Sequence, residues 1–154
     1  MKIVEQSELS DKQKQRIVEM WNAEYPAGLM HADISSFDEY LNALGGKRHF
    51  LLVEEAGEIA GWAVSFDRDG ARWFAVIIDG ARQGKGLGLM LLDALKASEK
   101  RLFGWVIDTD DYRKSGGEPY RSPLGFYKKI GFRVHDGERL VKQNISGVKI
   151  EWNA

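Results

Sequence analysis

The first third of the chain carries two runs of hydrophobic residues at the spacing of an amphipathic helix, after a short edge strand expected over residues 2–5. Ser10 and Gln13 have the spacing of a capping box, so the first helix should begin after Ser10 and end at the proline and glycine that follow it. Ser36 and Glu39 repeat this spacing and predict a second helix. The apolar stripes are Ile17, Met20, Trp21 and Tyr25 in the first helix, and Phe37, Tyr40, Leu41 and Leu44 in the second.

In the middle of the chain the hydrophobic period changes to that of β-strands. Strands are expected over residues 49–54, 59–66 and 72–78, and the turns between them contain Gly57 and Gly70. Because these connections are short, neighbouring strands must run antiparallel.

A glycine-punctuated loop at 79–86 comes next, followed by an amphipathic helix over 87–100 and a strand over 102–107. This strand, helix, strand order implies a right-handed crossover and therefore a parallel pair of strands. Beyond it, a short helix should end near Ile130. The last two strands are expected around 132–135 and 148–152. The pattern thus predicts a mixed α/β fold whose sheet is mostly antiparallel, with one parallel pair near its centre.

Composition restricts the class of protein. The 154 residues include 44% hydrophobic and 29% charged residues and no linker or repeat, so we expect a single domain over 1–154. The formal net charge of -1 makes neither nucleic acid nor an anionic membrane an expected partner. The absence of cysteine excludes disulfides and thiolate metal sites, and no metal is expected. No signal peptide or apolar stretch long enough to cross a bilayer is evident, so the expected location is the cytoplasm.

The segment Gln83-Gly84-Lys85-Gly86-Leu87-Gly88 joins an apolar strand to the amphipathic helix. Glycines let a backbone approach a ligand closely, and a helix start offers unpaired amides, so the segment could hold a phosphate group. A tight turn whose glycines serve only packing is the alternative. The spacing does not fit a Walker loop, because only three residues separate Gly80 from the following Gly-Lys pair. The even spacing of the three later glycines also rules out the dinucleotide fingerprint.

The order Gln-x-x-Gly-x-Gly, with Gln83, Gly86 and Gly88, resembles the coenzyme A signature of the GNAT superfamily of N-acetyltransferases. The segment from Phe126 to Phe132, Phe-Tyr-Lys-Lys-Ile-Gly-Phe, is similar to the Phe-Tyr-x-x-x-Gly-Phe of that superfamily, and the order and separation of the two motifs also agree. The resemblance implies a GNAT-like twisted sheet of about six to seven strands. Helices would cover both of its faces, and its parallel strand pair would be splayed.

The same resemblance implies acetyl-CoA as the co-substrate. The loop amides would wrap its pyrophosphate, and its pantetheine arm would lie between the splayed strands like an added strand. Unpaired strand edges that a ligand buries make physical sense of such a gap. The residues implied to bind the coenzyme are Val76, Ile77, Ile78, Gln83, Gly84, Lys85, Gly86, Leu87 and Gly88.

The reaction implied is direct attack of a primary amine, on a small molecule or a peptide, at the thioester of acetyl-CoA. It requires a neutral amine, a donor to the developing oxyanion and a proton for the departing thiolate. A backbone amide between Val76 and Ile78 would serve the oxyanion. Tyr127 matches the tyrosine that often acts as general acid in the family, and its phenol has an ordinary pKa of roughly 10.

The general base stays open at this point. Many relatives place a glutamate or histidine on the strand before the glycine loop, where this chain has Arg72 and Phe74. Asp108 is the candidate best placed, directly after the second splayed strand, and a relay of ordered water is the alternative. The other candidates are Asp79, Asp110, His31 and His49.

The loop over 109–122 departs from the family pattern, with Tyr120 and Pro123 where relatives often carry an asparagine and a small residue. Loops in such positions usually carry specificity. Side chains expected to contact the acceptor are Trp21, Tyr25, Tyr112, Glu118 and Tyr120.

Two other functional classes remain open. A GNAT-like protein could bind acyl-CoA as a sensor without transferring it, and the unassigned base gives this alternative weight. A nucleotide-binding module is disfavoured by the failed Walker spacing. The C-terminal strands, which end at residues 148–152, could also pair with the edge of another subunit, which leaves a homodimer open.

Overall fold

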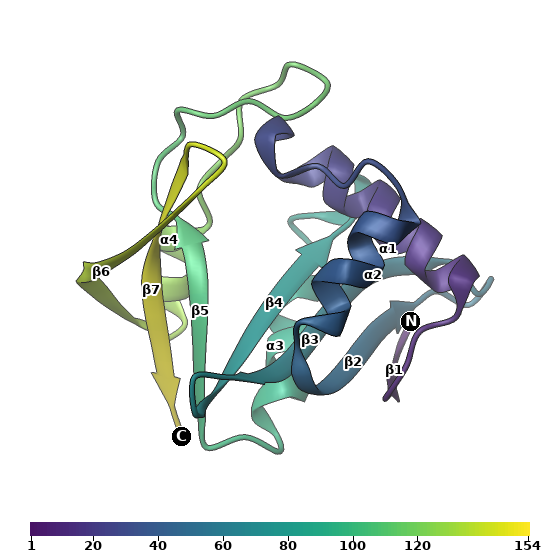
Figure 1. Ribbon diagram of the computed structural model, residues 1–154. Helices are drawn as coiled ribbons and strands as arrows, with labels where there is room; N and C mark the ends of the chain where they lie inside the picture. The colour runs from purple at the N-terminus through teal and green to yellow at the C-terminus, as the bar shows by residue number, and fades with distance from the viewer.

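The computed structural model describes residues 1–154 and contains one seven-stranded sheet, in the order β1-β2-β3-β4-β5-β7-β6 (Figure 1). Every neighbouring pair is antiparallel except β4 and β5, which are parallel and lie near the centre. The predicted mixed sheet is confirmed. The strands are β1 (Lys2–Gln6), β2 (Gly45–Val53), β3 (Ile59–Arg68), β4 (Ala71–Ile78), β5 (Arg101–Ile107), β6 (Arg133–Lys142) and β7 (Ile145–Asn153).

Helices cover both faces of this sheet. One apolar cluster joins the first two helices to one face, and a second cluster joins the third and fourth helices to the other. The helices are α1 (Asp11–Glu24), α2 (Ile34–Asn42), α3 (Leu87–Lys96) and α4 (Leu124–Lys129), with short 3-10 turns η1 (Ala27–Leu29) and η2 (Gly80–Arg82). None of them is long and apolar enough to span a membrane.

The antiparallel half of the sheet follows directly from the sequence. Strand β3 is buried over its first eight residues because it lies between β2 and β4 with helices on both sides. Asp69 and Gly70 both have positive φ, at 51° and 75°, so the β3–β4 connection is a tight hairpin turn that suits the twist of the strands. In α1, Ser10 and Gln13 form the expected capping box.

The parallel pair at the centre splits along its length. Only Trp73 of β4 is in register with Phe103 of β5, and the strands then diverge toward the top of Figure 1. The Phe74 ring fills the space above Gly104, where an added Cβ would lie 2.7 Å from it. Beyond this point the facing edges of the two strands have no partner strand, which leaves room for a ligand between them.

Several element boundaries differ from the sequence prediction, and β2 begins four residues earlier than expected. Asp33, rather than Ser36, caps α2, since its side chain accepts the Ser36 amide at 2.9 Å. Helix α3 ends at Lys96, four residues early. Strands β6 and β7 are longer than expected and meet at a two-residue turn, Gln143-Asn144, in which both residues have positive φ.

The long hairpin changes the interpretation of the C-terminal strand. Strand β7 pairs with β5 along one edge and with β6 along the other, so residues 148–152 offer no free edge to a second subunit. The two edge strands are β1 and β6, and a homodimer through the C-terminal strands stays a prediction, with β6 as the free edge there.

Candidate active site

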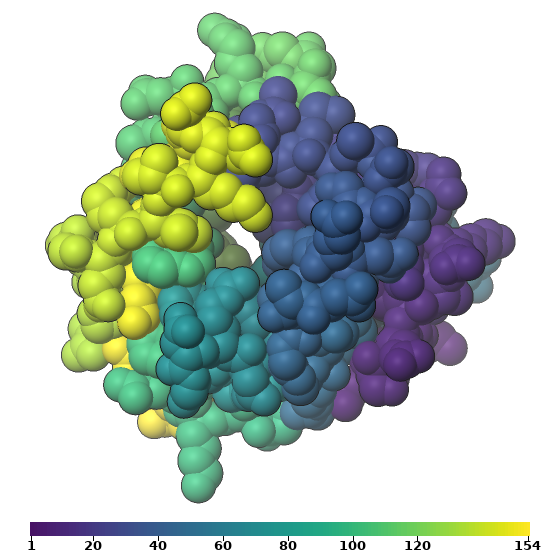
Figure 2. Space-filling view, in the orientation of Figure 1, coloured from purple at the N-terminus to yellow at the C-terminus, as the bar shows by residue number.

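The split between β4 and β5 opens into a cleft of about 790 Å³, and 21 of its 33 lining residues are hydrophobic. The opening lies between the β6–β7 hairpin, in yellow, and the segment around α2, in blue (Figure 2). Its lining comes from both faces of the sheet. One end is formed by the glycine loop and α3, and the other by α1, α2, β3 and the hairpin. Two ligands that enter from opposite ends of the cleft can therefore meet where the strands part.

The glycine loop forms one end of the cleft and offers a row of free donors. None of the backbone amides from Gly84 to Leu89 donates a hydrogen bond within the protein. Gly84 and Gly86 have φ of +80° and +76°, and nothing lies within 4 Å of a Cβ built on either. Gly86 is the N-cap of α3 and has no side-chain cap. Free amides, open space and the positive end of a helix dipole together suit an anionic group.

Side chains of this loop fix its position. The Gln83 amide donates to the Ile78 carbonyl at 3.2 Å and to Glu24 Oε1 at 3.3 Å, so it ties the loop to the end of β4. Arg82 is paired with Glu54 and Asp79 and holds the preceding turn. Lys85, expected to bind the coenzyme, is exposed and lies outside the cleft lining.

The remaining residues expected to contact the coenzyme do line the cleft. Val76, Ile77 and Ile78 contribute the β4 wall, and Gln83, Gly84, Gly86, Leu87 and Gly88 contribute the loop end. Alternation along β4 divides its side chains between the faces. Ile77 packs with the α1–α2 cluster, whereas Val76 and Ile78 pack with the α3–α4 cluster. The backbone edge of β4 that faces β5 runs between these two sets of side chains and has no partner strand.

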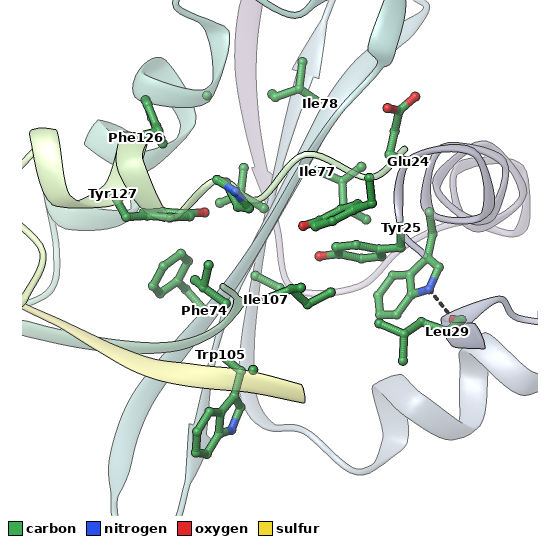
Figure 3. Close-up of a pocket in the computed structure, with 18 of the residues that line it drawn as sticks. Glu24, Tyr25, Leu29, Phe74, Ile77, Ile78, Trp105, Ile107, Phe126 and Tyr127 are labelled. Carbon is green, nitrogen blue, oxygen red and sulfur yellow. Dashed lines mark hydrogen bonds between the residues drawn. The ribbon is translucent and has the colours of Figure 1, made fainter. Parts of the chain in front are cut away.

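Tyr127 lies where the strands part. Its ring packs against Phe74 and Phe132, with centroids 5.8 and 5.2 Å away, while its hydroxyl points into the cleft toward Tyr25 (Figure 3). Burial, and then the neighbouring Tyr120, hold the pKa of Tyr127 well above its ordinary value. The phenol therefore stays protonated and can donate a hydrogen bond but cannot accept a proton as a base.

Three further tyrosines face the same space. Burial raises the pKa of Tyr120 and of Tyr40 to about 12, and burial with the nearby tyrosines raises that of Tyr25 well above 10. All three line the cleft. The centre of the cleft is thus lined by neutral hydroxyl donors at physiological pH.

Asp108 does not line the cleft. Its two oxygens accept Arg139 Nη1 and Nη2 at 3.0 and 2.8 Å, and this pairing with Arg139 lowers the pKa of the carboxyl. A carboxylate held in this way is a weaker proton acceptor than a free one. Its assignment as base stays a prediction, which this geometry disfavours.

The other proposed bases are also engaged elsewhere. Asp79 pairs with Arg16 and Arg82, and Asp110 accepts the Ser122 amide at 2.7 Å. His49 is buried and accepts from Trp62 Nε1 at 3.0 Å, whereas His31 Nδ1 lies 2.8 Å from Ser36 Oγ. None of these four side chains lines the cleft.

Glu24 is the one carboxylate in the lining, and no pattern in the sequence singled it out. Lys114 Nζ lies 3.1 Å from its Oε1, and the Gly80 amide donates to its Oε2 at 3.1 Å. Gln83 occupies Oε1 as well. Glu24 therefore connects α1 to the glycine loop and to the 108–122 loop, and both of its oxygens are in use.

The end of the cleft opposite the loop is aromatic. Trp21, Tyr25 and Tyr120, three of the five residues expected to contact an acceptor, line the cleft. Tyr112 does not, because its hydroxyl accepts the Ser146 amide at 2.9 Å and supports the hairpin, and Glu118 also lies outside. Lining residues that the sequence analysis did not single out include Arg68, Trp73, Trp105, Leu140, Lys142 and Ile145.

A known protein family and several solved structures resemble this chain. The model of the acetyltransferase (GNAT) domain family matches residues 46–134, more than half of the chain. No curated protein sequence matches the chain.

Several solved structures share the fold. An aminoglycoside 6'-N-acetyltransferase complexed with coenzyme A is 14% identical, with a TM-score of 0.72 over 99% of this chain and 97% of that one. A phosphinothricin acetyltransferase from Sinorhizobium meliloti, in complex with acetyl-CoA, is 12% identical, with a TM-score of 0.66 over 99% and 89%. A chimera of the spermidine N-acetyltransferase from Vibrio cholerae with hSSAT is 15% identical, with a TM-score of 0.64 over 99% of this chain and 96% of that one.

Proposed function

The chain belongs to the GNAT family of acetyltransferases, and we propose that it transfers an acetyl group from acetyl-CoA directly to a primary amine. The observation that carries this proposal is the cleft itself. It joins a loop of unpaired amides to the unpaired edge of β4, and it ends beside the hydroxyl of Tyr127.

The residues present fit acetyl-CoA. Backbone amides from Gly84 to Leu89 would hold the pyrophosphate, and the absence of side chains at Gly84 and Gly86 lets the phosphates approach. The edge of β4 from Val76 to Ile78 would bond the amides of the pantetheine arm as a neighbouring strand would. When bound, the coenzyme supplies an activated acetyl thioester.

The protein positions the two substrates and donates hydrogen bonds to the atoms that gain negative charge. A backbone amide of β4 between Val76 and Ile78 would donate to the acetyl oxygen as negative charge develops on it. The acceptor nitrogen bonds to the acetyl carbon while the carbon–sulfur bond breaks, and the nitrogen gives up its proton to water. Tyr127 would donate a hydrogen bond to the departing sulfur, which leaves as the thiolate.

The cleft also accounts for a reaction without a carboxylate base. An apolar site disfavours the charged form of an amine by desolvation, so an acceptor that binds there loses its proton more easily than in water. The neutral tyrosines around it can hold a water molecule that receives this proton.

Tyr127→Phe tests the chemical assignment. We expect kcat to fall by about tenfold or more, since the donor to the sulfur is lost, while the dissociation constant of coenzyme A changes little. The measurement is release of free coenzyme A thiol together with the acetylated amine, detected by mass spectrometry. Lys128→Gln, at the exposed neighbouring position outside the cleft lining, is the control. Equal kcat in Tyr127→Phe would remove Tyr127 from the mechanism, and coenzyme binding without any acetylated amine would favour the sensor.

A further inference from the structure

Charge is distributed unevenly around the acceptor end of the cleft. Arg68, Arg121 and Lys142 line it, and no carboxylate lies within 4 Å of any of them. The only carboxylate in the lining, Glu24, is already matched by Lys114. An acceptor that enters this end therefore meets uncompensated positive charge and no free negative charge.

Two of these cations flank one patch of aromatic rings. Arg68 extends β3 on the α1–α2 face, where its guanidinium lies 4.9 Å from the Phe66 ring and 5.6 Å from the Trp73 ring. It acts electrostatically on Tyr40. Lys142, at the end of the hairpin, acts in the same way on His31, whose ring lies 5.8 Å from that of Tyr40. Both cations therefore lie near the neighbouring rings of Tyr40 and His31.

The patch itself suits a bulky apolar group. The Trp21 ring meets Tyr25 and Tyr40 edge to face at 4.8 and 5.0 Å, and Trp105 stacks on Trp73 at 5.3 Å. Trp21, Tyr25 and Trp105 all line the cleft, and Figure 3 draws Tyr25 and Trp105 among its lining residues. Aromatic walls of this kind favour a planar or bulky hydrocarbon body.

From this juxtaposition we infer that the acceptor is an amine that also carries a carboxylate and a bulky apolar body, of which an aromatic amino acid is the simplest example. The inference rests on the proposed acetyl transfer. Arg68 and Lys142 bind the carboxylate, and the aromatic rings hold the body against the wall of the cleft. A polycation such as a polyamine or an aminoglycoside meets repulsion at the same place, because no lining carboxylate is free to pair with it.

The arrangement also assists the chemistry. Fixed positive charges and desolvation both favour the neutral form of a nearby amine. The carboxylate of the acceptor satisfies the two cations, while its amino group faces the apolar junction of β4 and β5, where Tyr25 and Tyr127 point toward one another. Recognition of the carboxylate and activation of the amine thus come from the same lining.

A matched series of acceptors tests this inference. Acetylation is measured with phenylalanine, with phenylalanine amide, with phenethylamine and with spermidine, each with acetyl-CoA, and binding of acetyl-CoA is measured separately by calorimetry. We expect kcat/KM to be at least tenfold higher for phenylalanine than for its amide or phenethylamine, and lowest for spermidine.

Two variants test whether Arg68 and Lys142 cause the preference for phenylalanine. Arg68→Gln and Lys142→Gln should each raise KM for phenylalanine about tenfold and leave KM for phenethylamine unchanged. Lys100→Gln, which removes an exposed lysine outside the cleft that forms no ion pair, should change neither.

The outcomes separate the inference from the function. If acetyl-CoA binds and spermidine is acetylated faster than phenylalanine, the acceptor class is wrong and the acetyltransferase stands. Binding of acetyl-CoA with no acetylation of phenylalanine also overturns the acceptor class. If acetyl-CoA does not bind to the folded protein, the proposed function itself fails.

Discussion

Replacing Gly86 by glutamate, with glutamine as the matched control, isolates the electrostatic character of the glycine loop. Gly86 has φ of +76°, and a Cβ built on it meets nothing within 4 Å, so either side chain fits without a clash. Both substitutions should destabilise the fold by the same amount, about 1–2 kcal/mol, because each places a side chain on a left-handed backbone position. For a domain of this size that lowers the melting temperature by about 2–8 °C in each variant.

The difference between the two variants is then a charge. At about 5 Å from a phosphate charge, a carboxylate is repelled by about 0.8 kcal/mol at the dielectric constant of water and by about 3.3 kcal/mol at an effective dielectric constant of 20. A pyrophosphate presents two such charges. Gly86→Glu should therefore bind coenzyme A at least tenfold more weakly than Gly86→Gln, since tenfold corresponds to about 1.4 kcal/mol.

Titration calorimetry with coenzyme A at two salt concentrations measures this difference. The difference in coenzyme A affinity between the two variants should become smaller at high salt, because screening weakens a repulsion between partly exposed charges. Equal affinity of Gly86→Glu and Gly86→Gln would show that no phosphate lies at this loop. Wild-type affinity in both, with both folded, would refute the assignment of the loop altogether.

Three further predictions concern residues around the cleft and in the core. Asp108→Asn should keep kcat within about twofold, because the side chain lies outside the cleft lining; a fall of about 100-fold in steady-state kcat would restore Asp108 as the base. Gly104→Ala should cost about 1–3 kcal/mol in urea unfolding, since the new methyl group would lie 2.7 Å from the Phe74 ring, and unchanged stability would contradict the packing described. Burial lowers the pKa of His49 to about 4, whereas the unfolded chain binds this proton near pH 6.5, so stability present at neutral pH is lost as the pH falls between those values. Between pH 7 and pH 5 this loss should be about 2 kcal/mol, and the loss should be smaller in His49→Gln; an equal loss in that variant would exclude His49 as its source.

The sequence predicted the part of the fold that local signals determine. The capping box of α1, the tight turn at Asp69-Gly70 and the short connections that make the middle strands antiparallel all act over a few residues, and the structure confirms them. The two motifs then indicated which strands should split.

The parts that were missed depend on contacts between distant segments. The two-residue turn at Gln143-Asn144 has no glycine to signal its left-handed backbone, so the long β6–β7 hairpin was not expected. The position of Lys142, at the end of this hairpin, was therefore not expected either. Similarly, no local pattern shows that Glu24 of α1 would meet Lys114 and the Gly80 amide.

For the same reason, none of the side chains expected as bases lines the cleft. Asp108 follows the splayed strand as predicted, but its direction is set by Arg139, which lies on a hairpin strand that folds back from further along the chain. Sequence position alone could place the carboxylate near the site and could not show that a guanidinium would hold it away.

Thermal unfolding in the presence of acetyl-CoA tests the central claim most directly, with coenzyme A, NAD and ATP measured alongside. A ligand at about 100 times its dissociation constant stabilises the fold by about 2.7 kcal/mol, which is about 5–10 °C here. The account predicts such a shift with acetyl-CoA and coenzyme A and a much smaller one with NAD and ATP. No shift with either coenzyme, in a folded sample, would contradict it.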